Sequence, residues 1–499
     1  MLVLAIVVPV AGVVLSMALG GRQSERIALV AMAAGFCIAL AIAADIWLTR
    51  TVLVYRIGGW TPPLGIALRA DGLSAIMALT TAVVICAIGL FARENFSVPA
   101  GAQEQRGPMA FWTLLMGVWS GLNAVWLGGD LFTLYVALEL LTFGAVPLVS
   151  LDGRAETLAA ALRYLLFALL GSALYLLGAA LFYGGYGTLD IELLAGLVHP
   201  EPVVWIAVAL MTVGLIAKTA LFPLHLWLPP AHAGAPAAGS ALLSALVVKG
   251  SFVLIVRLWF DTVPGLLDQA AAQALAALGA MAIVFGSVLA LRQARLKLLI
   301  AYSTIAQIGY LFFLFPLAGA QSAVLPGAVQ LWNGIAWTGG VLQLVSHAVA
   351  KAAMFMAAGL IAEALGHDRI AGFAGIGRAM PMTVFAFALG GMSLMGLPPS
   401  GGFVAKAMLL MAAVAEGQWW WAVVILSGGL LAAGYVFRVL TPALAVADAP
   451  VVLRVSVAQG RQRVVLALSI CALLLGLVPL RPSLLLEVGR HVPASVMSR

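Results

Sequence analysis

The sequence predicts an all-α, polytopic membrane protein with about fourteen transmembrane helices. Of its 499 residues, 64% are hydrophobic and only 9% are charged, and apolar runs of about twenty residues, the length that spans a bilayer as a helix, recur from end to end. A transmembrane β-barrel would show segments of about ten residues in which apolar and polar residues alternate. Stretches such as Val203 to Ala217 are apolar all round instead, which favours helices.

Short polar loops divide the apolar sequence into individual spans. Two spans, 329–364 and 382–415, are longer than about 30 Å of hydrocarbon requires, so we expect each to be broken, kinked or extended beyond the membrane. Pro398 and Pro399 mark the expected break in the second. The expected spans are 2–20, 27–48, 73–92, 109–128, 131–150, 158–184, 203–225, 237–259, 270–291, 298–317, 329–364, 382–415, 419–441 and 464–487.

The basic residues of the loops predict the orientation. By the positive-inside rule, the side with more of them faces the cytoplasm of a bacterial-type inner membrane, and both termini lie outside the cytoplasm. An even number of spans also puts both termini on one side. The cytoplasmic set is Arg22, Arg26, Arg93, Arg106, Arg154, Arg292, Arg295, Lys297, Arg369, Arg378, Arg454, Arg461 and Arg463, and the opposite set is Arg50, Arg56, Arg69, Arg481, Arg490 and Arg499.

We expect neither a cofactor or metal site nor a nucleic-acid site in this chain. It has no P-loop, Rossmann fingerprint, c-type haem motif or metal-binding cluster. Cys37, Cys86 and Cys471 lie singly in apolar segments and are interpreted as packing residues. The net charge of +7 reflects membrane topology rather than an acidic partner. The chemistry that we expect is the movement of charge.

Lysine is scarce, and it is concentrated in the membrane. Of the five lysines, only Lys297 lies near a loop, whereas Lys218, Lys249, Lys351 and Lys406 lie inside apolar spans. An ammonium group is costly at that depth and can lose its proton, which a guanidinium cannot. A GC-rich genome would explain the scarcity of lysine but not its placement. We therefore interpret the four lysines as functional titratable groups.

One acid complements these lysines. Asp130 is the expected N-cap of a helix, and Glu139 follows it about 13 Å deeper in the membrane. A buried glutamate either stays protonated as an inert hydrogen-bonding group or pairs with a cation such as Lys218. We favour the pair.

Three histidines are further candidates. His347 precedes Lys351 by four residues, so both lie on one helix face and could form adjacent steps of a relay. For His225 and His347 a helix-to-helix hydrogen bond is an equal alternative, and His232 is the weakest of the three. Three arginines near span ends are interpreted as snorkelling or structural: Arg163, Arg257 and Arg438.

Two segments hint at an internal duplication. The segment KTALFP (218–223) and the segment PPSGGFVAK (398–406) each place a lysine beside a proline break in an apolar run. They lie five spans apart, and an odd offset inverts the second copy relative to the first, as in transporters built from inverted repeats.

Four long motifs resemble one known family. They are similar to the antiporter-like subunits of respiratory complex I and of Mrp-type multisubunit Na⁺/H⁺ antiporters, and the likeness extends from about Asp71 to Lys406. The motifs are AKTALFPLHLWLPPAHAGAPAAGSALLSALVVKG (217–250), LKLLIAYSTIAQIGY (296–310), SHAVAKAAMFMAAGLI (346–361) and GLPPSGGFVAKAMLL (396–410).

The resemblance implies a particular architecture. It implies a subunit of fourteen helices with two inverted five-helix repeats, each centred on a broken helix, the seventh and the twelfth. The implied parts are helices 1–3 in residues 1–108, the first repeat (helices 4–8) in 109–259, the second repeat (helices 9–13) in 270–441, and the last helix with the tail in 464–499.

The resemblance also implies roles. Glu139 matches the acid of the fifth helix, Lys218 its partner on the seventh, Lys249 the relay lysine of the eighth and Lys406 the exit residue of the twelfth. Two further matches lie in the motif of the eleventh helix, His347 and Lys351. The chain is most similar to the shorter subunits, the Mrp D-type and the complex I M- and N-types, although the M-type has glutamate where this chain has Lys406.

The leading hypothesis is a proton-translocating subunit of a multisubunit membrane complex, with Na⁺/H⁺ exchange left open. Its expected partners are other membrane subunits, protons or Na⁺, and the lipid bilayer. The chain itself has no recognisable redox or hydrolytic site, although it could serve an NADH:quinone oxidoreductase-type translocase. The alternatives are a stand-alone secondary transporter of a small solute, with a pocket at the broken helices, and a membrane scaffold with inert lysines.

Overall fold

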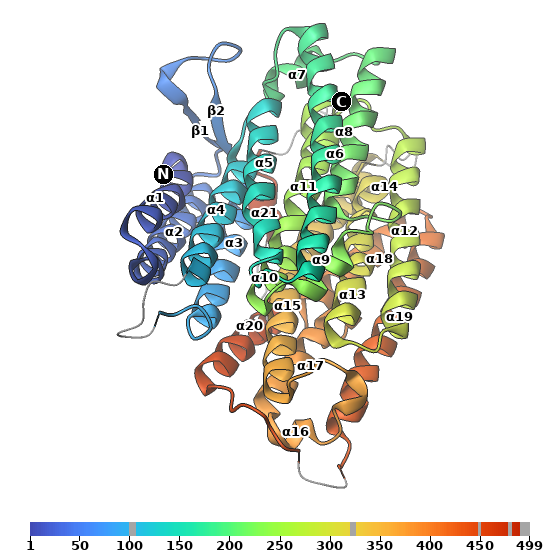
Figure 1. The fold of residues 1–499 in the computed structure, drawn as a ribbon. Helices are drawn as coiled ribbons and strands as arrows, with labels where there is room; N and C mark the ends of the chain where they lie inside the picture. Colours follow the sequence, from blue (N-terminus) through green and yellow to red (C-terminus); the bar gives the residue numbers. More distant parts are fainter. Residues whose placement is uncertain (99–105, 320–325, 448–450, 478–481, 490–499) are drawn as a thin grey trace.

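The protein is a bundle of long helices that run between two ends of the molecule (Figure 1). The computed structural model describes residues 1–98, 106–319, 326–447, 451–477 and 482–489. In these residues, thirteen helices are long and apolar enough to cross a membrane. The shorter helices α17 (Pro381–Met395) and α18 (Gly401–Ala415) follow one another as the halves of a further span. The predicted polytopic helical fold with about fourteen spans is therefore confirmed.

The remaining helices follow one another along the chain, many of them separated only by short turns. They are α1 (Leu2–Leu19), α2 (Gly21–Thr49), η1 (Ile57–Gly59), α3 (Gly72–Ala92), α4 (Arg106–Leu127), α5 (Leu131–Val149), α6 (Ala155–Tyr186), α7 (Ile191–Leu197), α8 (Pro202–Thr219), α9 (Leu228–Gly234), α10 (Ala237–Leu242), η2 (Leu243–Val247), α11 (Val248–Val256), η3 (Arg257–Thr262), α12 (Gln269–Arg292), α13 (Leu296–Leu311), α14 (Leu314–Ala318), α15 (Pro326–Leu365), η4 (Ile370–Gly372), α16 (Ile376–Ala379), α19 (Trp419–Leu444), α20 (Gln459–Leu477) and α21 (Pro482–Leu486).

A small hairpin adds strands that were not predicted from the sequence. Strands β1 (Leu53–Arg56) and β2 (Ala67–Ala70) pair antiparallel, and they lie with α7 at one end of the bundle, opposite α16 (Figure 1). The signal was present, because a short run of β-branched and aromatic residues precedes Gly-Gly and Pro-Pro turn residues. The purely α-helical description needs this one correction.

Both expected helix breaks are present. Helix α8 ends at Thr219, inside the expected span 203–225, and the chain turns before α9 begins. Pro223 has no N–H to continue a helix there. The second break lies between α17 and α18 and contains Pro398 and Pro399. The long eleventh span, in contrast, is one continuous 40-residue helix, α15, so it is extended rather than broken.

Two further differences concern the ends of spans. The expected eighth span is helical but contains two π-helical segments, η2 and η3, and it continues to Thr262. The expected span 464–487 is helical in α20 and in α21, and its residues 478–481 lie outside the described residues. So do Arg481, Arg490 and Arg499 of the predicted orientation.

Short polar side chains fix where the helices begin. Asp130 caps α5 by accepting hydrogen bonds from the N–H groups of Phe132 and Thr133, at 3.0 and 2.8 Å, as its predicted N-cap role requires. Asp71 caps α3 and Ser400 caps α18 in the same way. These caps satisfy N–H groups that lipid cannot.

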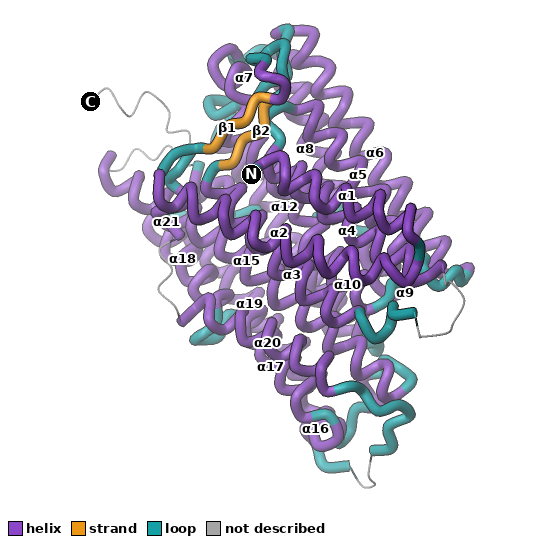
Figure 2. Tube along the Cα trace, turned by 90° about the vertical axis from the view of Figure 1, so that its left-hand side faces the viewer, coloured by secondary structure: helices purple, strands orange, loops and turns teal. Residues whose placement is uncertain are grey.

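The helices differ in how far they are enclosed by protein. The eighth span, from α10 to η3, is fully surrounded by other helices, and α15 is nearly so. Helices α1 and α2 lie along one side of the bundle and leave much of their apolar surface exposed (Figure 2). The enclosed spans carry Lys249 and Lys351, so these lysines face protein rather than lipid.

Glycine allows α6 and α8 to approach closely. A Cβ atom added to Gly171 would lie 2.6 Å from the carbonyl oxygen of Gly214, and one added to Gly214 would meet the carbonyl oxygen of Gly171. Small residues at such a crossing let two membrane helices touch along their backbones. The contact lies one turn before Lys218 and so sets the position of that lysine.

We expect Gly214→Leu to separate α6 from α8 and to lower the free energy of unfolding by about 1–3 kcal/mol, the usual cost of overpacking. Thermal unfolding of the purified complex in detergent measures this. Gly184→Leu is the matched control, because Gly184 lies in α6, one of the two helices of the crossing, and has open space around its Cβ position. Equal unfolding temperatures for the two variants would show that the close crossing is not needed.

Candidate functional site

Glu139 and Lys218 form the predicted pair. Lys218, in the last turn of α8, donates to the Glu139 carboxylate on α5, with Nζ 3.3 Å from Oε1. The two side chains are only 7% and 15% exposed. Lys218 also donates to the Thr142 hydroxyl at 2.9 Å, and the Ser172 hydroxyl on α6 donates to Glu139. A buried ion pair needs such additional hydrogen bonds to offset its desolvation.

A small cavity adjoins this pair. Its volume is about 10 Å³, which is near the lower limit for one water molecule, and Lys218 and Thr142 lie on its wall. Its lining also includes Val247 and Ser251 of the span that carries Lys249. The space is too small for an organic solute. Among the described residues, no hydrogen bond joins Lys218 to Lys249 directly, so this cavity is the space that both Lys218 and the eighth span line.

Lys249 lies in the centre of the protein, directly after a π-helical segment. Its side chain is fully buried and donates to the Ser244 carbonyl oxygen within η2. The Ser244 hydroxyl is 2.9 Å from the Thr304 hydroxyl of α13, and Thr304 donates to the Ile300 carbonyl oxygen at 3.0 Å. π-Helical segments occur frequently at functional sites. Hydrogen bonds therefore connect the surroundings of Lys249 to the neighbouring helix.

Lys351 meets the same carbonyl from the other side. Its Nζ atom donates to the Ile300 carbonyl oxygen at 2.9 Å and to the Ser303 hydroxyl at 2.5 Å. Four residues earlier on α15, His347 is buried, and neither of its ring nitrogens has a hydrogen-bond partner among the described residues. Because α15 is a continuous helix, His347 and Lys351 lie about one turn apart on it, as their spacing predicted.

Lys406 binds a carbonyl group that the helix break leaves free. Its Nζ atom is 2.6 Å from the Leu394 carbonyl oxygen of α17. In an unbroken helix this oxygen would accept from the N–H of residue 398, which is a proline and has none. Gln307 of α13 donates to the same oxygen at 3.1 Å, and Gln343 of α15 donates to Gln307 at 3.1 Å. Gln343 lies one turn before His347, so polar groups extend along α15 toward Lys406.

The histidines of the broken seventh helix lie in different surroundings. The His225 ring packs against Phe222 and Phe285, with ring centroids 5.7 and 5.4 Å apart, and no hydrogen bond in the described part of the chain joins it to a lysine. His232, the weakest candidate on sequence alone, is fully buried and stacks on Phe355 of α15 at 4.6 Å. Both of its ring nitrogens lack a hydrogen-bond partner among the described residues. His232 therefore packs against α15, the helix of His347 and Lys351, whereas His225 packs against Phe285 of α12.

The uncharged groups that connect these residues were not predicted from the sequence. They are hydroxyl and amide side chains at bilayer depth, where polar side chains are rare and can signal function. The polar YSTIAQ segment of α13 contained part of that signal. The connecting residues are Thr142, Ser172, Ser244, Ser303, Thr304, Gln307 and Gln343.

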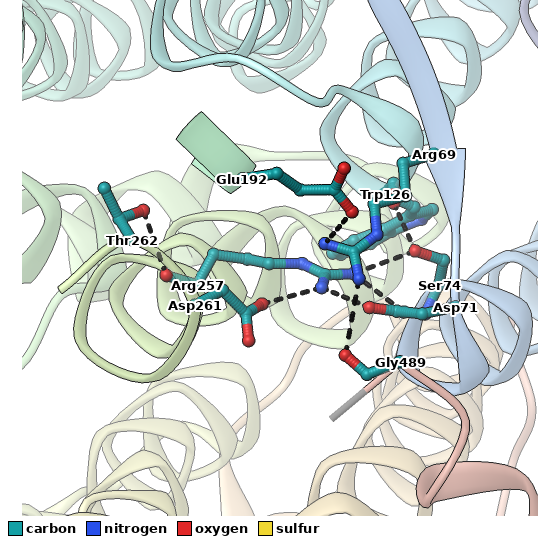
Figure 3. A network of polar contacts seen from close by, with 9 residues as sticks. All are labelled: Arg69, Asp71, Ser74, Trp126, Glu192, Arg257, Asp261, Thr262 and Gly489. Atoms are coloured by element: carbon teal, nitrogen blue, oxygen red, sulfur yellow. Dashed lines mark hydrogen bonds and ion pairs between the residues drawn. The ribbon is translucent and has the colours of Figure 1, made fainter. Parts of the chain in front are cut away.

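A second polar network lies at the end of the eighth span (Figure 3). The Arg257 guanidinium of η3 contacts both carboxylate oxygens of Asp71, with Nη2 2.8 Å from Oδ1, and lies 2.7 Å from Asp261. It also donates to Ser74 at 2.9 Å, and Ser74 donates to the Trp126 carbonyl oxygen at 2.6 Å. Arg257 is thus structural and buried, the second of the two roles expected for it.

The same network reaches other segments of the chain. Arg69 of β2 pairs with Glu192 of α7 at 3.3 Å and donates to the Gly489 carbonyl oxygen at 3.4 Å (Figure 3). Burial alone would raise the pKa of the Asp71 carboxyl, but the Arg257 charge and hydrogen bonds from Arg257 and Ser74 lower that pKa to about 2. Asp71 therefore stays ionised at physiological pH.

The fold and the site define a polytopic helical membrane protein whose interior carries a row of buried ionisable side chains. The family model described as NADH:quinone oxidoreductase/Mrp antiporter, transmembrane, matches residues 128–432. The chain belongs to this family, as the resemblance in its motifs implied. It is a membrane subunit of the complex I and Mrp antiporter type.

Individual relatives support the assignment. The chain is 33% identical over 390 residues to the N-type subunit of the NADH-quinone oxidoreductase of Desulforudis audaxviator, covering 77% of this chain and 74% of the relative. It is 28% identical to the D-type subunit of the Na⁺/H⁺ antiporter of Bacillus subtilis, with 72% and 69% covered. A chain in the structure of the Mrp complex from Dietzia sp. superimposes with a TM-score of 0.86 at 25% identity, with 97% of both chains covered.

We expect Arg257→Met to destabilise the protein by about 3–5 kcal/mol, because it leaves two buried carboxylates without their counter-charge. Chemical unfolding of the purified complex measures the change. Arg56→Met is the control, since Arg56 lies exposed on β1. The triple change Asp71→Asn, Arg257→Met and Asp261→Asn should recover part of the loss. If Arg257→Met unfolds like Arg56→Met, the network does not stabilise the fold.

Proposed function

We propose that this chain translocates protons across the membrane as part of a multisubunit complex of the complex I or Mrp antiporter type. The observation that carries the proposal is the buried Glu139–Lys218 pair beside a water-sized cavity. Lysine can give up a proton where arginine cannot, and a water in the cavity would link Lys218 to the eighth span. The size of this cavity also argues against the alternative of an organic solute bound beside Lys218.

In the proposed mechanism, Glu139 controls Lys218. While the pair is closed, the carboxylate stabilises the ammonium form of Lys218. When Glu139 moves away, the ammonium group loses its counter-charge in a poorly polarisable environment and passes its proton through the cavity toward Lys249. Lys249 then becomes the charged group of the central helices.

The later steps follow the hydrogen bonds of the central helices. The proton moves from Lys249 toward Lys351 and His347 across the hydroxyl groups of η2 and α13, and then toward Lys406 at the second helix break. His232 and His225 are secondary candidates, and His232 is favoured by its position. Exchange of Na⁺ for the protons is the alternative within this proposal.

We also propose the orientation and the internal repeat. The Arg-rich loops would face the cytoplasm of a bacterial-type inner membrane, with both termini on the other side. Helices 4–8 (109–259) and 9–13 (270–441) would be inverted repeats, between the N-terminal part (1–108) and the last helix (464–499). Support comes from the two helix breaks, each of which has a lysine within a few residues.

Lys218→Arg is the sharpest test of the relay. Arginine keeps the charge next to Glu139 but cannot release a proton, so we expect the complex to assemble and transport to fall about a hundredfold. Glu139→Gln should also abolish most transport, whereas Glu156→Gln, at an exposed position on α6, is the control and should leave it unchanged. Proton uptake into proteoliposomes that contain the co-purified complex measures the effect.

Normal pumping by both Lys218→Arg and Glu139→Gln would contradict the relay. Measuring proton movement in the same proteoliposomes with Na⁺ on one side shows whether Na⁺ is exchanged for protons. If proton movement needs Na⁺ and the Lys218→Arg variant loses the coupled Na⁺ flux, the complex is an antiporter. If proton movement is independent of Na⁺, protons alone are moved.

A further inference from the structure

Two of the lysine-bearing spans end in a carboxylate at the same membrane face. The eighth and twelfth spans are separated by an even number of crossings, so both end at one face, with Asp261 in η3 and Glu416 directly after α18. Asp261 is paired with the Arg257 guanidinium. For Glu416, no ion pair is present among the described residues. The two carboxylates therefore differ in whether their charge is fixed.

A cluster of neutral polar groups lies next to Glu416, which is partly exposed. The Oε2 atom of Glu416 is 3.4 Å from the amide nitrogen of Gln418, whereas its Oε1 atom is buried and has no hydrogen-bond partner among the described residues. Gln418 also donates to the Pro316 carbonyl oxygen at 3.2 Å and accepts from Gln273 at 2.8 Å. Trp421 donates to Gln273 at 3.0 Å. These bonds hold the Gln418 amide so that its nitrogen faces the carboxyl group.

The surroundings of Glu416 favour a carboxyl group that changes its protonation state near neutral pH. Burial raises the pKa of Glu416 to about 7, against a small opposing effect of the Gln418 hydrogen bond. The residues that contact its cluster from α12, α14 and α19 are Gln273, Pro316 and Trp421, and all three are uncharged. An acid with such a pKa exchanges protons efficiently with water.

Aromatic side chains connect Lys406 to this cluster. The Lys406 Nζ atom lies 4.2 Å from the centre of the Tyr310 ring, and the rings of Tyr310 and Phe313 are 6.3 Å apart. Phe313 in turn lies 5.3 Å from Trp421, whose indole N–H belongs to the Glu416 cluster. A constriction of apolar rings can close a pathway by excluding water and open it when water enters.

We infer that Glu416, held by Gln418 and Gln273, is the proton-exchange site of this membrane face, and that Tyr310, Phe313 and Trp421 separate it from Lys406. The inference rests on the proposed function, because it supplies the end of that proton pathway. In the transfer, an N–H bond of the Lys406 ammonium group breaks and its proton passes to an intervening water molecule. A proton from that water then forms an O–H bond on the Glu416 carboxylate. The carboxylic acid then loses the same proton to bulk water.

Infrared spectroscopy of the assembled complex tests the site directly. The wild type should show a carboxylic acid band that titrates near pH 7, and Glu416→Gln should remove this band. Glu201→Gln is the matched control, because Glu201 is an exposed glutamate at the start of α8, on the same face. The control should retain the band.

Transport in proteoliposomes gives the functional result. Glu416→Gln should slow proton movement on the order of tenfold, since water replaces part of the exchange, and should flatten the pH dependence around pH 7. A purely structural hydrogen bond to Gln418 would survive in glutamine, so an unchanged rate and pH profile would overturn the inference. A band that persists in Glu416→Gln would overturn it as well.

Two further measurements separate the possible failures. If the Glu416→Gln variant does not assemble, Glu416→Asp is used in its place. The carboxylic acid band of this variant should titrate with a shifted midpoint, and an unchanged midpoint would refute the assignment of the band to Glu416. Lys218→Arg is measured in parallel. If it loses transport while Glu416→Gln does not, the relay stands and the exchange site is wrong. If Lys218→Arg and Glu139→Gln both transport normally, the proposed relay itself has failed.

Discussion

An ammonium group inside a bilayer must take its oxygen partners from the protein, because lipid chains offer none. The four buried lysines satisfy this constraint in two ways. Lys218 has a carboxylate, Glu139, whereas Lys249, Lys351 and Lys406 each have a backbone carbonyl oxygen. A carbonyl dipole orients an ammonium group but does not neutralise it. The pair with Glu139 is therefore the one place in the row where moving a single side chain changes the charge balance strongly.

Two of the three carbonyl partners lie at irregular parts of helices, whereas the Ile300 carbonyl that binds Lys351 lies within the regular helix α13. A regular helix uses its carbonyl groups for its own hydrogen bonds, so an interruption of that pattern makes a carbonyl group more available to a lysine. Pro398 interrupts it for Leu394, which is then free to bind Lys406. A π-helical segment precedes Lys249 and contains the carbonyl group of Ser244 that binds it. The breaks and the π segment are thus part of what makes buried lysines tolerable.

The sequence revealed the charged groups because each is unusual by itself. Glu139 and the four lysines stand out in apolar runs, and the prolines mark the breaks, so the helix count and the Glu139–Lys218 pair were predictable. The hydroxyl groups that connect the lysines were not predictable. Thr304, for example, contacts Ser244 only because α13 packs with Thr304 facing it. That orientation depends on how distant helices pack. For the same reason the stacking of His232 on Phe355 of α15 was not predictable from the sequence.

The partition between arginine and lysine extends to the ends of the spans. At the end of the eighth span, Arg257 keeps its positive charge permanently, and two aspartates compensate for that charge. A proton could leave or enter there only if this buried ion cluster broke. At the end of the twelfth span, the hydrogen-bond cluster that includes Glu416 otherwise consists, in the described part of the chain, of neutral amide, carbonyl and indole groups. In the proposed relay, the fixed ion cluster would close one route and the titratable acid would leave the other available. The direction of the proposed charge movement, from Lys218 toward Lys406, would then be set by the chemistry at the membrane surface as much as by the lysines between.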